Sequence, residues 1–138
     1  MKIRKPILYF LVFSISFFMA ILLSRTFIVY ADNKAKDYIE DFNVNSLHVP
    51  DGEYSGNFKI LGVFAVAKVK FVIEKSHIKE ISFKRILHSP GKNYEIDIER
   101  KILDNQDLEL DAITGATRTS NFAKAAIKNA IQKKSPKK

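Results

Sequence analysis

An uncharged apolar segment near the N-terminus constrains the fold more than any other feature. From Ile7 to Leu23 the sequence consists mainly of Leu, Ile, Phe and Val, and it follows a cluster of basic residues. A run of this length approaches the roughly 20 residues that a bilayer-spanning helix needs, and it exceeds the apolar core of an ordinary signal peptide. The sequence therefore favours a membrane anchor that is retained over residues 1–31.

Cleavage by a signal peptidase is the alternative. In Val29-Tyr30-Ala31 the first residue is branched and the third is small, and these are the two places where the peptidase would accept such residues. Both alternatives export the rest of the chain, because the basic cluster of Lys2, Arg4 and Lys5 should remain in the cytoplasm. We therefore expect Asp32 onward to lie outside the cytoplasmic membrane. The domain is then either tethered as a single-pass membrane protein or secreted after cleavage near Ala31.

Scarce residue types exclude several classes of protein. The 138 residues contain no cysteine, which excludes disulfides, thiolate metal sites, a lipoprotein attachment site and a thiol nucleophile. The three histidines, His48, His77 and His88, lack the spacing of metal ligands. The net charge of +8 is concentrated at the two ends of the chain, with no nucleic-acid motif between them. We predict neither a metal site nor a nucleic-acid partner.

Hydrophobic periodicity after Pro50 indicates a small α+β domain. Between residues 57 and 73 apolar side chains come to alternate with charged ones, as in a half-buried strand, and residues 78–86 resume the pattern as the second strand of an antiparallel hairpin. Apolar residues four apart predict helices over 94–103, where a strand also stays possible, and over 121–131. The expected fold class is α+β: a small antiparallel sheet with two packed helices, preceded by one N-terminal transmembrane or signal-anchor helix.

The expected organisation has four parts. Residues 1–31 form the membrane anchor or signal segment, 32–50 a polar linker, stalk or short helix, 51–132 the domain, and 133–138 a basic tail. Gly62 interrupts an apolar run inside the domain. It predicts a bulge or a place where another group approaches the backbone closely.

The stretch from Asp111 to Thr117 reads Asp-Ala-Ile-Thr-Gly-Ala-Thr and directly precedes the last predicted helix. Gly115 can take a positive φ, and Thr114, Thr117 and Thr119 offer hydroxyls that can cap a first helical turn. A helix N-terminus also attracts anions such as phosphate, and Thr117 would lie within reach of one. Taken alone, Thr-Gly-Ala-Thr could be no more than a turn with a hydroxyl cap.

A longer pattern is more specific. Residues 111–120, Asp-Ala-Ile-Thr-Gly-Ala-Thr-Arg-Thr-Ser, resemble the flavinylation motif D-x-x-[ST]-G-A-[ST] of FMN-binding domains. Such domains occur in FMN-carrying subunits of the sodium-pumping NADH:quinone reductase, in related electron-transport complexes and in small membrane-attached flavoproteins. Residues 51–56, Asp-Gly-Glu-Tyr-Ser-Gly, resemble the D-G-x-Y-x-G opening of the same domain, and Gln106 falls where the family often has a glutamine. The resemblance runs from about Asp51 to Ile131.

This resemblance implies that the cofactor is FMN, joined through a phosphoester to the hydroxyl of Thr117. A separate flavin transferase makes that bond in the family, with FAD as donor. Gly115 and Ala116 are small and leave room for a phosphate beside the backbone. The residues that the resemblance implies for recognition and positioning of the cofactor are Asp111, Thr114, Gly115, Ala116 and Thr119.

The implied function is electron transfer rather than stand-alone catalysis. The sequence offers no convincing acid–base pair and no Gly-rich dinucleotide loop. We expect a membrane-tethered, extracytoplasmic carrier that takes electrons from a membrane donor, either a quinone or an oxidoreductase, and passes them to an acceptor that the sequence does not identify. The chain is shorter than the subunits of the ion-pumping complexes, so a separate carrier is the better match.

Two alternatives remain open at this point. FMN could be held without a covalent bond, or the chain could be a non-redox binding or structural module on the same fold. Tyr54, Phe64 and Tyr94 are candidates for stacking on a flavin ring, although their aromatic side chains fit a core role better.

Overall fold

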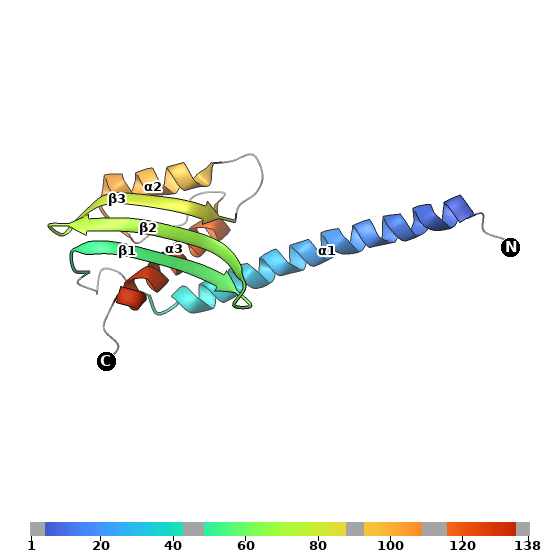
Figure 1. Cartoon of the computed structure of the whole chain (residues 1–138), viewed down its shortest axis with the longest axis horizontal. Coiled ribbons are helices and arrows are strands. Elements are labelled where there is room, and N and C mark those ends of the chain that lie inside the picture. Colours follow the sequence, from blue (N-terminus) through green and yellow to red (C-terminus); the bar gives the residue numbers. More distant parts are fainter. Residues whose placement is uncertain (1–4, 43–48, 88–92, 109–115, 135–138) are drawn as a thin grey trace. The chain divides into compact units, whose positions relative to one another are not determined.

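The structure is a computed structural model that describes residues 5–42, 49–87, 93–108 and 116–134. Its elements follow the order α1, β1, β2, β3, α2, α3 (Figure 1). The chain divides into two compact units, Met1–Ala31 and Asp32–Lys138. We call the second unit the folded domain.

Helix α1, Lys5–Ile39, confirms the predicted N-terminal helix. Large apolar side chains of its first part are exposed in the structure, among them Phe10, Phe13 and Phe17. A continuous exposed apolar surface is not stable in water. By length and composition α1 can cross a bilayer, which makes it a candidate membrane span.

Three antiparallel strands form one sheet in the order β1-β2-β3. Strand β1 is Gly52–Ile60, β2 is Phe64–Glu74 and β3 is His77–Ile86. In each strand buried residues alternate with exposed ones, so one face of the sheet is apolar and the other is polar. The predicted fold class and the predicted antiparallel hairpin of β2 and β3 are confirmed.

The segment 57–73 contains a turn that the sequence pattern hides. The amide of Val63 donates to the carbonyl oxygen of Ile60 at 3.3 Å, and Gly62 has a φ of +71°. The expectation of a bulge or a close approach at Gly62 is therefore wrong. A Cβ added at Gly62 would meet no atom within 4 Å, because the residue lies in an open turn. The apolar run continues through Leu61 and Val63 on both sides of Gly62, and this continuity masks the reversal.

Helix α2, Tyr94–Asn105, packs along strand β3 through the buried residues Ile98 and Ile102. This resolves the helix–strand ambiguity of that segment in favour of helix. Side chains from the helix and its C-terminus also bond the outer edge of β3. The Phe83 amide donates to Glu99 at 2.6 Å. Gln106 accepts from the Ile78 amide at 2.7 Å and donates to the Ile78 carbonyl at 3.1 Å. The edge strand is thereby covered.

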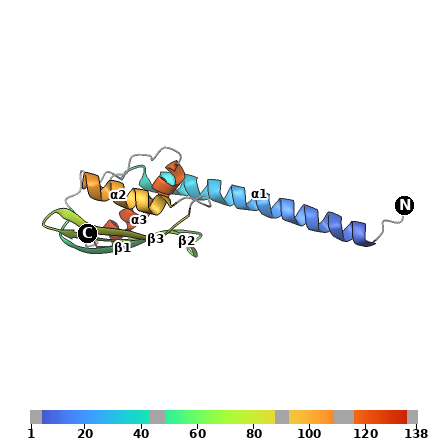
Figure 2. The same ribbon diagram turned by 90° about the horizontal axis from the view of Figure 1, so that it is seen from above.

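Helix α3, Thr117–Lys134, covers the apolar face of the sheet, mainly along β1 and β2. Figure 2 shows α2 and α3 on the same face of the sheet. The rings of Phe58 and Phe122 lie 6.4 Å apart between β1 and α3. The second predicted helix is confirmed, and its buried face consists mainly of small or branched residues: Ala123, Ala125, Ala126, Ile127, Ala130 and Ile131.

The segment 51–56 has a structural role in this fold. The Asp51 carboxylate accepts from the amides of Lys75 and Ser76 at 2.7 and 2.9 Å and so closes the β2–β3 turn. The ring of Tyr54 is stacked on Phe71 with centroids 4.9 Å apart. This places Tyr54 in the core, and burial together with the nearby Asp51 charge raises its pKa.

Gly56 lets α3 approach β1 closely. A Cβ at this position would lie 2.3 Å from the carbonyl oxygen of Ala126 and 2.5 Å from the amide nitrogen of Ala130. Both contacts are with helix backbone, which cannot move aside without shifting α3. A residue without a side chain is therefore required here.

The last turns of α1 belong to the folded domain. Asn121 of α3 donates to Asp32 at 2.9 Å, and the Tyr38 hydroxyl donates to Gln132 at 2.8 Å. Lys128 donates to the Tyr38 carbonyl oxygen. The predicted segment 32–50 therefore begins as helix on α3, and its residues 43–48 lie outside the described part of the chain.

Replacing Gly56 by alanine should destabilise the folded domain by about 1–3 kcal/mol, because the added methyl group overlaps the α3 backbone. The measurement is the free energy of unfolding of the full chain in detergent by denaturant titration. Ser55→Ala is the matched control: Ser55 lies on the exposed face of β1, so its change should stay within about 0.5 kcal/mol. Equal stability of the two variants would contradict the close approach.

Candidate cofactor site at the N-terminus of α3

Thr117 is the first residue of α3, and its side chain is exposed. The preceding residue, Ala116, is buried and accepts the amide of Ser120 at 2.9 Å in the first helical hydrogen bond. The Ser120 hydroxyl donates to the same oxygen at 3.2 Å. These two bonds close the first turn of α3, in which Ala116 is buried and Thr117 is exposed.

Thr119 lies in the same turn but is buried. Its hydroxyl is therefore less accessible than that of Thr117, although the two residues are two positions apart. Among the predicted site residues, the structure brings Ala116, Thr117 and Thr119 together. Asp111, Thr114 and Gly115 lie outside the described residues, so their predicted roles stay predictions.

The electrostatics of this helix end favour an anion. The first N–H groups of an α-helix have no acceptor within the helix and carry partial positive charge. No acidic residue occupies the first turn of α3, and Arg118 adds an exposed cation. A phosphate group attached to Thr117 would meet positive potential there, so the described residues fit a phosphate-bearing cofactor.

The buried carboxylate of Asp32 holds this turn to the end of α1. It accepts from Asn121 at 2.9 Å, pairs with Lys36 at 3.0 Å, and lies 3.8 Å from Arg118. Sequence reasoning placed Asp32 at the start of a linker and missed this contact. The only local signal was the spacing of Asp32 and Lys36, four residues apart on one helix.

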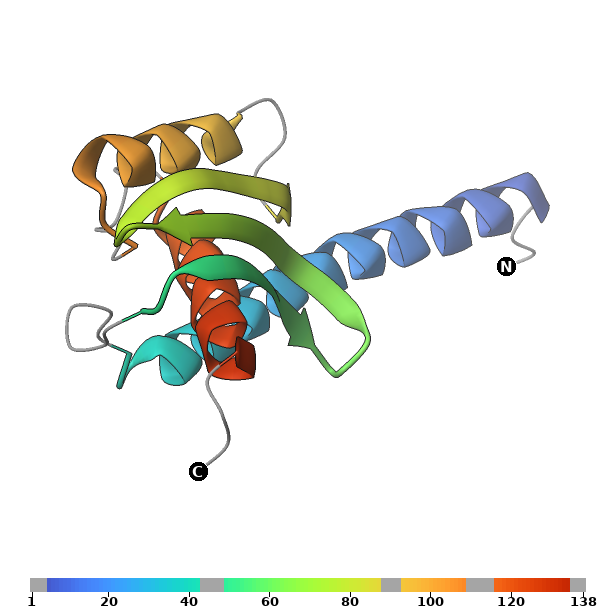
Figure 3. The ribbon, with the colours of Figure 1, turned by 60° about the vertical axis from the view of Figure 1, so that its left-hand side comes forward.

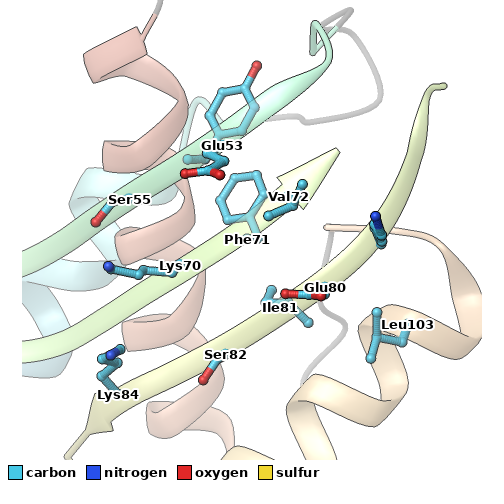
Figure 4. A pocket seen from close by; sticks show the side chains of 12 residues that line it. Glu53, Ser55, Lys70, Phe71, Val72, Glu80, Ile81, Ser82, Lys84 and Leu103 are labelled. Atoms are coloured by element: carbon cyan, nitrogen blue, oxygen red, sulfur yellow. The ribbon is translucent and has the colours of Figure 1, made fainter. Parts of the chain in front are cut away.

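The exposed face of the sheet carries a groove, separate from the α3 N-terminus. Its volume is about 640 Å³, and Leu103 of α2 borders it beside the strands. Figure 4 shows cationic residues, Lys70 and Lys84, toward one end and acidic residues, Glu53 and Glu80, toward the other. Thr117 does not line this groove.

Metal chemistry finds no support in the described ranges. No group of three or more His, Cys, Asp or Glu side chains in them could hold a metal ion. The candidate site is the α3 N-terminus, where a phosphate could be held by helix amides and by Arg118.

Comparison with known families identifies the domain that contains this helix end. The sequence model of the FMN-binding domain matches residues 53–132, which include Thr117 and most of the folded domain. The chain belongs to the FMN-binding domain family. FMN is its cofactor, and the protein is a flavoprotein.

Other comparisons add little. No curated protein matches the chain. A crystal structure of the CPE2226 protein from Clostridium perfringens is similar, with 22% sequence identity, a TM-score of 0.45, and coverage of 62% of this chain and 92% of that one.

Replacing Asp32 by alanine should lower the free energy of unfolding by about 1.5–3 kcal/mol, because Asn121 and two cations lose a buried charged acceptor. Thermal or denaturant unfolding of the full chain in detergent measures the effect. Asp37→Ala on the same helix is the control, since Asp37 is exposed and its loss should be nearly neutral. A neutral Asp32→Ala variant would contradict the role given to this carboxylate.

Proposed function

We propose that FMN is attached covalently to Thr117 and that the domain carries electrons outside the cytoplasmic membrane. The observation that carries the proposal is the position of Thr117: an exposed hydroxyl on the first residue of α3, within the matched family domain. Neighbouring Thr119 and Ser120 are buried. An external transferase could reach the Thr117 hydroxyl most directly.

The attachment reaction fits the chemistry of this position. The oxygen of Thr117 would form a phosphoester with the FMN phosphorus of FAD while the pyrophosphate bond breaks and AMP leaves; the hydroxyl proton passes to a base of the transferase. Helix amides and Arg118 stabilise the negative charge of the resulting phosphodiester. The buried Ala116 keeps the backbone beside the phosphate free of bulk.

The flavin supplies the redox chemistry, since it can accept and donate electrons, and the chain supplies attachment and orientation. The Asp32–Asn121 bond holds the start of α3 to α1 within the folded domain. An attachment point on a helix that is held in this way would limit where the ring can travel. Such a domain serves as an electron carrier, or as a subunit of an oxidoreductase, between a membrane donor, such as a quinone or another oxidoreductase, and an acceptor.

Helix α1 supports membrane tethering. The helix is long and apolar enough to span a bilayer, and the basic residues before it favour the cytoplasmic side. The folded domain would then lie on the extracytoplasmic side.

Thr117→Ala should abolish covalent flavin while the domain stays folded, because an exposed side chain contributes within about 0.5 kcal/mol to stability. The full chain is co-expressed with a flavin transferase and denatured, and in-gel flavin fluorescence and intact mass are recorded. Ser55→Ala is the control, since it removes an exposed hydroxyl on β1 outside the candidate site and should keep the label. Labelled Thr117→Ala protein, or unlabelled wild type beside an active transferase, would contradict the attachment.

Membrane topology can be tested with single cysteines, because the natural chain has none. Ser76→Cys in the exposed β2–β3 turn should react with a membrane-impermeant maleimide in intact cells, whereas Lys2→Cys should react only after lysis. The intact mass of the protein purified from the membrane fraction should correspond to a chain that still contains residues 1–31. The reverse labelling pattern would place the domain in the cytoplasm.

A further inference from the structure

The turn between β1 and β2 exposes three large apolar side chains in succession around one glycine. Leu61 is 67% exposed, Val63 is 75% exposed and Phe64 is 59% exposed. Figure 3 shows this turn projecting at one end of the sheet. We call Leu61–Phe64 the apolar tip. Exposed apolar groups clustered in this way mark interaction sites.

Leu61 is poorly suited to its backbone position. Leu61 and Gly62 have φ values of 54° and 71°, the successive left-handed conformations that tight hairpins usually give to Asn-Gly. A leucine is disfavoured in this region, and its exposed side chain gains no burial in return. Neither backbone conformation nor burial within the domain therefore accounts for the leucine.

The opposite turn provides an internal comparison. Lys75 and Ser76, between β2 and β3, have φ values of 52° and 61°, close to those of Leu61 and Gly62. Their side chains are polar, and their amides are bonded to Asp51. Two turns of similar geometry at the two ends of one sheet thus differ sharply in polarity.

Charged residues of the exposed face are also distributed unevenly between the two ends of the sheet. No acidic residue occurs from Tyr54 to Ile73, whereas this segment contains three lysines: Lys59, Lys68 and Lys70. Lys68 lies opposite Arg85 on β3, which places another cation toward the apolar tip. The acidic residues of the exposed face lie toward the other end: Glu53, Glu74 and Glu80. An apolar tip with flanking cations matches an anionic lipid surface.

The apolar tip lies at the end of the domain where the chain enters it. Lys134, the last residue of α3, donates to the Glu53 carbonyl oxygen at the start of β1, and Phe122 lies beside Phe58 near the end of β1. The N-terminus of α3 therefore lies toward the apolar tip (Figure 1). Asp32, where the folded domain begins, contacts Asn121 in that same part of α3.

We propose that the apolar tip inserts into the interfacial layer of the anionic membrane in which the chain is anchored. The inference rests on the membrane tethering of the proposed function. Leu61, Val63 and Phe64 bury their side chains among lipid head groups and upper acyl chains, and the neighbouring lysines contact lipid phosphates. The domain is then held at two points, its linkage to the anchor and the tip, with the N-terminus of α3 turned toward the membrane.

Tryptophan reports the depth of the tip, since the natural chain contains none. The full chain, flavinylated and carrying Val63→Trp, is reconstituted in phosphatidylcholine–phosphatidylglycerol nanodiscs. Its fluorescence is compared with that in nanodiscs of brominated lipids, so that quenching by flavin cancels in the ratio. We expect a blue-shifted emission and strong quenching by brominated lipid. His77→Trp, at the exposed opposite turn, should show neither.

A second variant separates the natural tip from the reporter. Leu61→Asn creates the favoured Asn-Gly turn, so it should not impair folding, and Phe64→Thr keeps a strand former at the start of β2. In the Val63→Trp background this pair should lose most of the quenching by brominated lipid. Quenching that is equal for Val63→Trp and His77→Trp, or unchanged in the Leu61→Asn/Phe64→Thr background, would overturn the proposal.

Failure of this proposal is distinguishable from failure of the proposed function. Co-purification of the chain with nanodiscs reports the anchor, and covalent flavin reports Thr117, independently of the tip. If the Val63→Trp chain is anchored and flavinylated but its fluorescence signal equals that of the His77→Trp control, only tip insertion is refuted.

Discussion

The close approach of α3 to β1 at Gly56 is the contact on which the rest of the domain depends. Because the carbonyl oxygen of Ala126 and the amide of Ala130 would lie within 2.5 Å of any Cβ there, α3 can occupy this position only over a glycine. The helix direction is then set by contacts on both sides of that point, Lys134 at the start of β1 and Phe122 near its end. The location of Thr117 follows from this packing.

Elements with clear periodicity could be predicted from the sequence. The alternation in β2 and β3 and the four-residue repeat of α3 each identify a type of element because burial on one side imposes that period. The apolar run of α1 is recognised instead by its length and its lack of charge. The β1–β2 turn could not be predicted, since the apolar run continues through Leu61 and Val63 on both sides of Gly62. The contact of Asp32 with Asn121 joins residues 89 positions apart and leaves no local pattern.

The two segments that carry the family resemblance have different roles in the structure. Residues 51–56 build the end of the sheet: Asp51 closes a turn, Tyr54 stacks on Phe71, and Gly56 admits the helix. Thr117 instead presents a hydroxyl at the opposite end of α3. Sequence alone associates both segments with FMN, whereas the structure assigns a scaffold role to the first. Asp111, Thr114 and Gly115 lie outside the described residues, so the roles that the sequence suggests for them stay predictions.

Side chains cap both outer edges of the sheet. Glu99 and Gln106 bond the backbone of β3, and Asn129 accepts the amide of Asn57 on β1 at 3.2 Å. An uncapped edge pairs readily with the edge of another copy. A domain confined beside a bilayer meets its neighbours at high effective concentration and in a restricted set of orientations. In the membrane-tethered arrangement that we propose, capped edges would oppose such strand-to-strand association between neighbouring copies.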